Sequence, residues 1–276
     1  DDNNLKTGYY YFVANGENYP VHVITLDGNQ HFTENQTFGD DKDVATATDY
    51  AQNMVIVKVN GDLTIDEGVT VGPYYTNYGG PKGFILYVTG KLTNNGTIDN
   101  SHGAKAEGQN VYLWKNTDGT YEYVPALGGS GAGAQTITQT AGKTGGSGSG
   151  RQTGGGGSGA KYDSNSGAGG AGTSYSGGAG GGAGILGSPS ATAGSSVGGA
   201  GGNSAKDAGS MGGTGNPGGN GTYNGANGTG GLLTIYANEY ENKGIISAVG
   251  TASSTKATFG GGSSGGGSIN IFTNQS

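Results

Sequence analysis

Residues 83–98 read GFILYVTGKLTNNGTI, an apolar run followed by a polar bend. The run from Phe84 to Val88 is aromatic and β-branched, which is typical of a strand. Leu92 follows four residues later, and Asn95 and Gly96 suit the positive φ angles of a tight bend. The stretch therefore predicts a strand, a bend and the start of a second strand.

The same pattern recurs along the chain. Each copy has an apolar strand, then Leu or Tyr, then a glycine corner and a β-branched pair; the copies are 54–69, 84–98 and 232–246, with a truncated copy at 268–272. Such repeats are typical of solenoids, because one repeat cannot bury its own inward face. The predicted fold class is all-β, a β-helix or solenoid of stacked rungs. A β-sandwich or jelly roll with coincidental spacing is the alternative.

The rungs divide the chain into four predicted parts. Residues 1–53 form an N-terminal β-rich cap or assembly segment. Residues 54–127 hold rungs and a hairpin at 111–124, where Asp118 and Gly119 mark the turn. Residues 128–231 are a glycine-rich insert, and residues 232–276 hold the C-terminal rungs.

Two interpretations of the glycine-rich insert stay open. Its composition is typical of a flexible linker or disorder, because it offers little apolar area to offset the entropy of ordering. The alternative is an ordered insert of polyproline-II-like runs (polyglycine II), which pack side by side and pair their backbone amides in place of a core. No Gly-X-Y phase persists, and this excludes collagen.

Charge and composition restrict the partners and the location. The net charge is −7, and the 13 Lys and Arg residues form no cluster, so we expect neither nucleic acid nor an anionic membrane as a partner. No apolar run reaches the roughly 20 residues of a membrane span. The chain has no cysteine and begins at Asp1 without Met, which fits an extracellular protein whose leader has been removed; a longer chain trimmed at its start would look the same. We expect a location outside the cell, on a cell surface or a virion surface.

The sequence offers no set of residues for catalysis, a metal or a cofactor. His22, His31 and His102 have no spacing that converges on a metal, and thiolates are absent. The carboxylates Asp40, Asp41 and Asp43 leave calcium binding open, although the loop pattern of an EF-hand is missing. We therefore expect no enzyme activity and no cofactor.

Exposed aromatic side chains are the best binding candidates, because rigid rings supply contact area at low entropic cost. Three lie in a Pro- and Gly-rich loop and three on the hairpin: Tyr74, Tyr75, Tyr78, Trp114, Tyr121 and Tyr123. The alternative is that some of them pack against the flank of the rungs.

The rungs at 83–98 and 260–271 resemble glycine-rich, pectin-lyase-like β-helix proteins of bacterial surfaces and phage tails. The alternation of glycine tracts with short variable islands is similar to phage tail-fibre adhesins with polyglycine-rich domains. The resemblance covers roughly the rungs and implies a receptor-binding protein. The chain lacks the steady Gly-X-X period and the Thr or Ala rows of glycine-rich antifreeze proteins.

The predicted function is non-catalytic and adhesive, with a cell-surface glycan or protein as the receptor. The first alternative is a self-assembling, homo-oligomeric filament subunit, because the open ends of a solenoid carry unpaired strand edges. Its assembly residues would be Tyr9, Tyr11, Val13, Ile269 and Ile271. A more distant alternative is a polysaccharide-active enzyme on a β-helix scaffold.

Overall fold

The structure is a computed structural model, and it describes residues 5–14, 17–39, 54–74, 83–101, 104–105, 109–115, 121–127, 160–161, 184–185, 228–229, 232–249 and 267–274. These residues form strands and their connections, with no helix among them, so the predicted all-β class is confirmed for this part of the chain. The chain divides into two compact units. The first is Asp1–Asn100, Leu233–Ser247 and Ile269–Ser276, and the second is Ser101–Leu232 and Ala248–Ser268.

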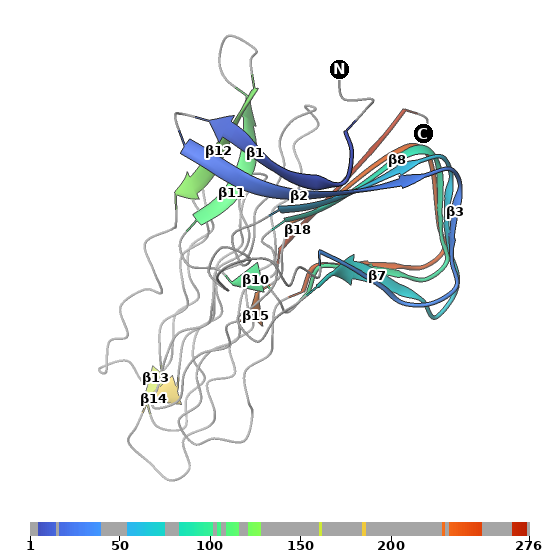
Figure 1. The fold of residues 1–276 in the computed structure, drawn as a ribbon. Helices are drawn as coiled ribbons and strands as arrows, with labels where there is room; N and C mark the ends of the chain where they lie inside the picture. The colour runs from blue at the N-terminus through green and yellow to red at the C-terminus, as the bar shows by residue number, and fades with distance from the viewer. Residues whose placement is uncertain are drawn as a thin grey trace. The chain divides into compact units, whose positions relative to one another are not determined.

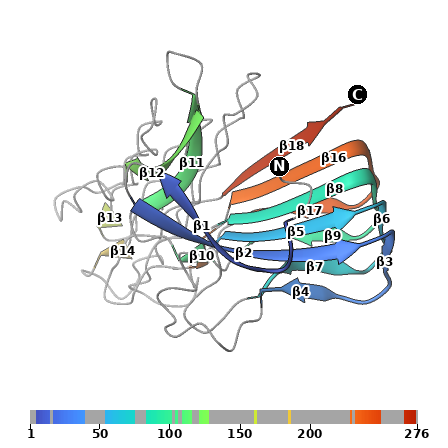
Figure 2. The same ribbon diagram turned by 45° about the horizontal axis from the view of Figure 1, so that its top comes forward.

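The larger sheet collects strands that lie far apart in the sequence. Its order is β1 (Gly8–Ala14), β2 (Glu17–Asp27), β5 (Met54–Asn60), β8 (Gly83–Asn94), β16 (Leu232–Asn242) and β18 (Ser268–Thr273). Strands β1 and β2 are antiparallel, whereas β2, β5 and β8 are parallel (Figures 1 and 2). The short strands β3 (Gln30–Phe32) and β6 (Leu63–Ile65) pair with each other, and β6 also pairs with β8.

A second sheet repeats the same order of segments. It consists of β4 (Gln36–Phe38), β7 (Thr70–Pro73), β9 (Thr97–Asp99) and β17 (Ile245–Ser247), which are parallel neighbours in that order. We call the strands from one copy of the repeat a layer: β2–β4 are the first layer, β5–β7 the second, β8–β9 the third, β16–β17 the fourth and β18 the fifth. The copies recognised in the sequence are therefore neighbours in space. Residues 17–38 supply a further layer that the sequence analysis did not count among the copies.

The core is built from side chains that stand in register between layers. Val55 pairs with Phe84, Val57 with Leu86 and Leu63 with Leu92, and all six are buried. Alternation along each strand sends every second residue to this side. Burying one such side chain contributes about 1.5–3 kcal/mol relative to leaving it in water.

Glycine corners let the layers approach closely. A Cβ atom on Gly244 would meet the carbonyl oxygen of Gly96, and one on Gly96 would meet the carbonyl oxygen of Val69. Backbone hydrogen bonds cross the same corners: Ile245 N donates to Gly96 O at 2.8 Å, and Thr97 N donates to Val69 O at 2.8 Å. At Gly96 and Gly244 glycine is therefore required by the approach of one backbone to the next, whereas at Gly68 it is favoured by a φ of +81°.

Among the described residues of the second unit, three pairs of strands are formed. Where the sequence predicts a hairpin at 111–124, β11 (Gln109–Lys115) and β12 (Tyr121–Leu127) pair antiparallel, and β12 continues through Pro125. Strand β10 (Ala104–Lys105) pairs antiparallel with β15 (Gly228–Thr229), and β13 (Ala160–Lys161) pairs parallel with β14 (Gly184–Ile185). Most of the predicted insert, 128–231, lies outside the described residues, so both interpretations of it stay predictions.

Candidate functional site

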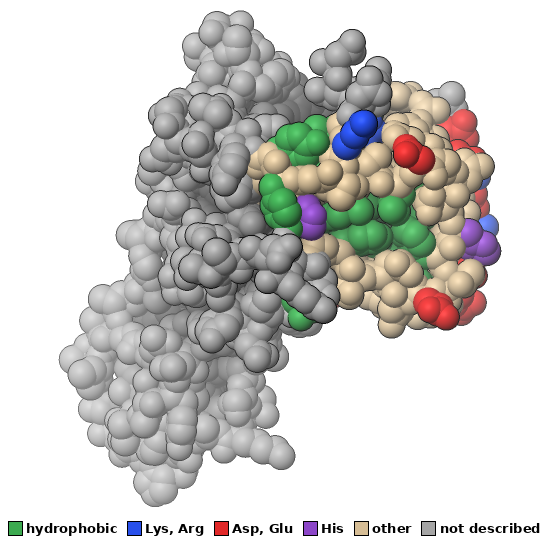
Figure 3. All heavy atoms as spheres, viewed as in Figure 1, with side chains coloured by type: hydrophobic (Ala, Val, Ile, Leu, Met, Phe, Trp, Pro, Cys, Tyr) green, Lys and Arg blue, Asp and Glu red, His purple; other side chains and the backbone are tan. Residues whose placement is uncertain are grey.

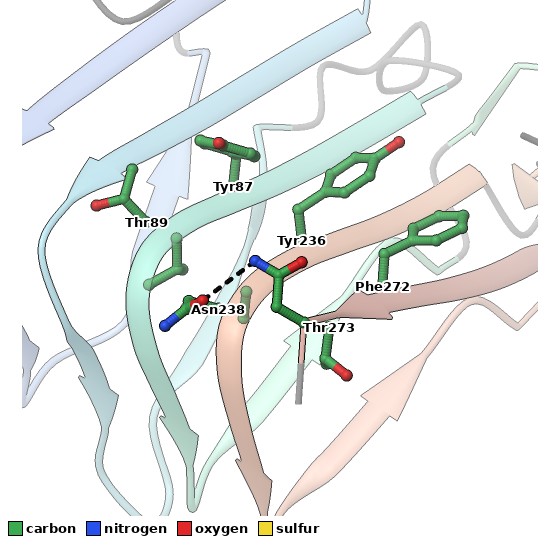
Figure 4. A pocket seen from close by; sticks show the side chains of 9 residues that line it. Tyr87, Thr89, Tyr236, Asn238, Phe272 and Thr273 are labelled. Atoms are coloured by element: carbon green, nitrogen blue, oxygen red, sulfur yellow. Dashed lines mark hydrogen bonds between the residues drawn. The ribbon is translucent and has the colours of Figure 1, made fainter. Parts of the chain in front are cut away.

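Three aromatic rings form a row on the outward face of the larger sheet. Tyr87 of β8 and Tyr236 of β16 have ring centroids 5.9 Å apart and planes tilted by 55°, and Tyr236 stacks on Phe272 of β18 at 4.9 Å and 14° (Figure 4). In β8 the neighbours Leu86 and Val88 are buried while Tyr87 is 41% exposed. Strand alternation therefore places the row opposite the core side chains.

The row borders a pocket of about 350 Å³ that lies within the first unit. Three residues from each of three neighbouring segments line it: 87–89, 236–238 and 272–274. None of these nine residues carries a formal charge. The pocket is thus a neutral depression with aromatic and polar sides.

A polar row lies beside the aromatic row, two residues further along each strand. Its members in the pocket are Thr89, Asn238 and Asn274, and Asn274 Nδ2 donates to Asn238 Oδ1 at 3.1 Å. In the first two layers, Asn60 Nδ2 donates to Asp27 Oδ1 at 2.8 Å. Hydroxyl and amide groups therefore stand close to the rings and can both donate and accept hydrogen bonds.

The aromatic row does not extend into the first two layers. Tyr87 pairs in register with Lys58 of β5, and Lys58 pairs with Thr25 of β2. The same outward position thus carries Thr in the first layer, Lys in the second and an aromatic ring in the last three. Because the layers stack without rings at two of these positions, the stacking itself does not require an aromatic side chain there.

The shifted pKa values of the described residues belong to side chains outside the pocket. Burial lowers the pKa of His22 and raises the pKa of Tyr240 to about 12. Hydrogen bonds from Lys243 and Lys91 lower the pKa of Glu241 to about 2, and the bond to Glu241 raises the pKa of Lys91. Packing and surface ion pairs account for these shifts, so they do not indicate a proton-transfer site.

Tyr74, the one predicted binding residue whose side chain the structure describes, does not line the pocket. Tyr74 is half-buried at the end of β7, and its backbone N donates to Phe38 O at 2.8 Å. Tyr75 and Tyr78 lie outside the described residues. Trp114 is in β11 opposite Glu122, while Tyr121 and Tyr123 are in β12 opposite Lys115 and Leu113. The loop and the hairpin belong to different units of the chain.

The predicted assembly residues lie in the two edge strands of the larger sheet. Tyr9, Tyr11 and Val13 are in β1, paired with His22, Pro20 and Asn18, and the ring of Tyr9 stacks on His22 at 4.4 Å. Ile269 and Ile271 are in β18 and are 39% and 40% exposed, whereas Asn270 between them is 2% exposed. The edge strand β18 thus leaves two apolar side chains partly in solvent.

The predicted calcium candidates Asp40, Asp41 and Asp43 lie outside the described residues, as does His102. Among the side chains that the structure describes, no three His, Asp or Glu groups cluster as a metal site would require. His31 Nε2 lies 2.8 Å from Asp66 Oδ1, and both side chains are exposed, while His22 stacks on Tyr9. The two described histidines therefore have separate surroundings.

Sequence reasoning missed Tyr87, Tyr236 and Phe272, although a signal was present. The copies read Tyr-Val-Thr at 87–89, Tyr-Ala-Asn at 236–238 and Phe-Thr-Asn at 272–274. An aromatic residue followed two positions later by Thr or Asn thus recurs at one place in the repeat. Aligning the copies position by position, rather than by their apolar residues, exposes it.

The described ranges include no helix with the length and hydropathy of a membrane span. Comparison of the chain with protein-family models, with curated proteins and with solved structures finds no match. The functional interpretation therefore depends on the geometry of the chain itself.

Proposed function

We propose that this chain is a non-catalytic, extracellular adhesive module, built as a β-helix, that binds a surface ligand through the pocket beside Tyr87, Tyr236 and Phe272. The proposal places it with the surface adhesins and tail-fibre-like receptor-binding proteins that its sequence resembles. It makes the layered strands the scaffold and the outward aromatic row the contact surface.

The β-helix architecture is supported by the register of the layers. Strands β2, β5 and β8 are parallel neighbours in one sheet, and β4, β7, β9 and β17 are parallel neighbours in the other. A chain that returns to the same side after each copy of a repeat builds a core shared between copies. The close glycine corners at Gly96 and Gly244 fit this arrangement.

The observation that carries the adhesive function is the aromatic row itself. Tyr87 and Tyr236 each lie between two buried residues of their own strand, so little conformational entropy is lost at these two rings when a ligand binds. The lining offers hydroxyl and amide groups but no carboxylate, imidazole, amine or thiol. Such a surface supports recognition better than acid–base catalysis.

A surface-binding assay tests the proposal. The full chain, labelled with a fluorophore, is applied to a panel of fixed bacterial and eukaryotic cells, and its binding is compared with that of Y87A/Y236A. We expect the double variant to lose most of the binding to whichever surface the unmodified chain selects. The matched control is Tyr10→Ala, which removes an exposed tyrosine of β1 that does not line the pocket.

The same assay separates this site from the residues singled out in the sequence. Variants of Tyr74, Tyr75 and Tyr78, and of Trp114, Tyr121 and Tyr123, are measured beside the pocket variants. Loss of binding in one of these sets, with the pocket variants unaffected, would move the contact surface to the loop or the hairpin. Equal binding by every variant would contradict an adhesive role for aromatic side chains.

A second candidate function is the filament subunit, favoured by the two edge strands of one sheet. A β-strand at a sheet edge presents unpaired backbone groups that another chain can extend. Strand β18 adds the exposed side chains of Ile269 and Ile271. Electron microscopy of the purified chain tests this function: regular fibres that I269K/I271K abolishes and that I245K leaves intact would support it, because Ile245 is 61% exposed on another strand. Persistent monomers would contradict it.

A further inference from the structure

Resting on the proposed adhesive function, we infer that the pocket beside Tyr87, Tyr236 and Phe272 binds a neutral oligosaccharide that runs across the strands. Two parallel rows of side chains on the outward face of the larger sheet support this inference. One row is aromatic, and the other consists of Thr89, Asn238 and Asn274.

The two rows match the two chemical characters of a sugar ring. A pyranose has faces made of C–H groups and a rim of hydroxyl groups. The aromatic faces attract the positively polarised C–H groups, because the ring quadrupole is negative on its face. The amide and hydroxyl row supplies donors and acceptors for the rim. The planes of Tyr87 and Tyr236 are tilted by 55° and do not cover each other face to face, whereas Tyr236 stacks on Phe272.

The charge of the pocket selects a neutral ligand. None of the nine lining residues is Lys or Arg. A phosphate, sulfate or carboxylate needs such a cationic partner when it is bound away from bulk water. Lys58, which neighbours Tyr87 in register, is only 5% exposed, and Lys91 is 2.7 Å from Glu241. Nucleotides and acidic glycans are therefore poor ligands for this face.

The backbone around the pocket disfavours a peptide. Extended peptides usually bind by adding a strand to a free sheet edge. Strand β8 lies between β5 and β16, and β16 lies between β8 and β18, so the strands that carry Tyr87 and Tyr236 are paired on both sides. Recognition at these two rings must therefore come from side chains, which suits a sugar.

The direction of the row predicts a dependence on chain length. The centroids of successive rings are 5.9 Å and 4.9 Å apart, and the row crosses three strands. A single sugar ring can contact only part of this row, whereas an extended oligosaccharide can follow it. We therefore expect affinity to rise with the number of sugar units until the row is covered.

The test measures binding of the full chain to neutral gluco-, galacto- and manno-oligosaccharides of increasing length, with sulfated and sialylated oligosaccharides alongside. Calorimetry should show that one neutral series binds, more tightly as it lengthens, and that Tyr87→Ala weakens it by about tenfold or more. Tyr87→Phe keeps the ring and should stay within about threefold, and Tyr10→Ala should match the unmodified chain. Saturation-transfer NMR on the unmodified chain, which needs no variant to fold, should label the C–H protons of one sugar face.

Cell binding then separates this inference from the proposed function. If Y87A/Y236A abolishes binding to cells, periodate treatment of the cells does so too and sialidase treatment does not, both stand. If binding depends on the pocket but survives periodate, and no neutral oligosaccharide binds at millimolar concentration, the ligand is of another class and the inference is overturned while the adhesive function survives. If no surface binding depends on the pocket, both fail.

Discussion

Asn94 Nδ2 donates a hydrogen bond to Asn242 Oδ1 at 2.7 Å, although 148 residues separate the two in the sequence. Asn94 is fully buried at the corner of the third layer, and the same amide also lies 3.3 Å from Ile245 O. The backbone N atoms of Lys243 and Gly244 donate to Asn94 O at 2.8 Å and 3.0 Å. This corner joins the layers that precede and follow the long insert in the sequence. We therefore expect its hydrogen bonds to contribute to the stability of the fold in addition to the burial of its side chains.

Removing the Asn94 side chain should destabilise the fold by about 1–3 kcal/mol, because Asn242 and Ile245 O lose a buried partner. Asn242→Ala should cost less, and the double variant should show a coupling energy of about 0.5 kcal/mol or more. Urea unfolding measures all three. Asn274→Ala is the matched control, since it removes an exposed Asn–Asn bond and should cost less than about 0.5 kcal/mol. Strict additivity of Asn94 and Asn242 would contradict the interaction.

Gly244→Ala should destabilise the chain by about 1–3 kcal/mol, because the new methyl group would meet the carbonyl oxygen of Gly96 and the carbonyl carbon of Asn95, the latter at 2.8 Å. Backbone cannot move aside there without breaking the bond from Ile245 N to Gly96 O. The control is Gly8→Ala in β1, where the nearest atom is a ring carbon of Tyr10 at 3.6 Å. Thermal unfolding should show a lowered Tm for the first variant only; equal Tm values would mean that the corners are not tightly packed.

Stability should fall as the pH is lowered below the ordinary His pKa of about 6.5, because burial lowers the pKa of His22. In that range the unfolded chain binds a proton more readily than the folded chain, so protonation favours unfolding. The measurement is the difference in unfolding free energy between His22→Phe and the unmodified chain at pH 7.5 and pH 5. The loss on acidification should be smaller in the variant, which keeps a ring for Tyr9 to stack on. An equal loss in both chains would assign the pH dependence to other groups.

Replacing residues 106–227 by Asn-Gly should leave the first unit folded. Strands β10 and β15 pair antiparallel with Lys105 opposite Gly228, a geometry that a two-residue Asn-Gly turn can close. Because a shorter loop costs less closure entropy, the unfolding free energy should stay the same or rise, by at most about 3.6 kcal/mol. Circular dichroism and urea unfolding measure this. Ala-Ala at the same place should be worse, since neither residue suits the positive φ angles of the turn; an unfolded Asn-Gly variant would show that the removed segment supports the core.

Much of the strand order could be predicted because apolar residues recur at equivalent positions in each copy of the repeat. The strands at 54–59, 84–88 and 232–236 share alternating core positions, and these became neighbours in one sheet. The first layer was harder to recognise because its apolar run, which includes His22 and Thr25, is more polar than the others. Its register with β5 depends on backbone pairing that composition does not record.

The candidate site was not predicted because exposed aromatic residues were sought in loops. Tyr74, Tyr75 and Tyr78 were conspicuous beside Pro and Gly, whereas Tyr87 and Tyr236 were counted as members of apolar strands. Periodicity alone does not say which face of a strand a tyrosine takes, since its ring suits a core and its hydroxyl suits water. Only the pairing of β8 with β16 and of β16 with β18 brings the three rings together.

The outward position held by Thr25, Lys58, Tyr87, Tyr236 and Phe272 has an evolutionary consequence. Each layer contributes one side chain to it, while the core is specified by the alternate residues of the same strands. Under the proposed adhesive function, the contact surface can therefore change one layer at a time while the buried residues of the same strands stay the same. Related chains would then be expected to differ at these positions while their glycine corners stay fixed.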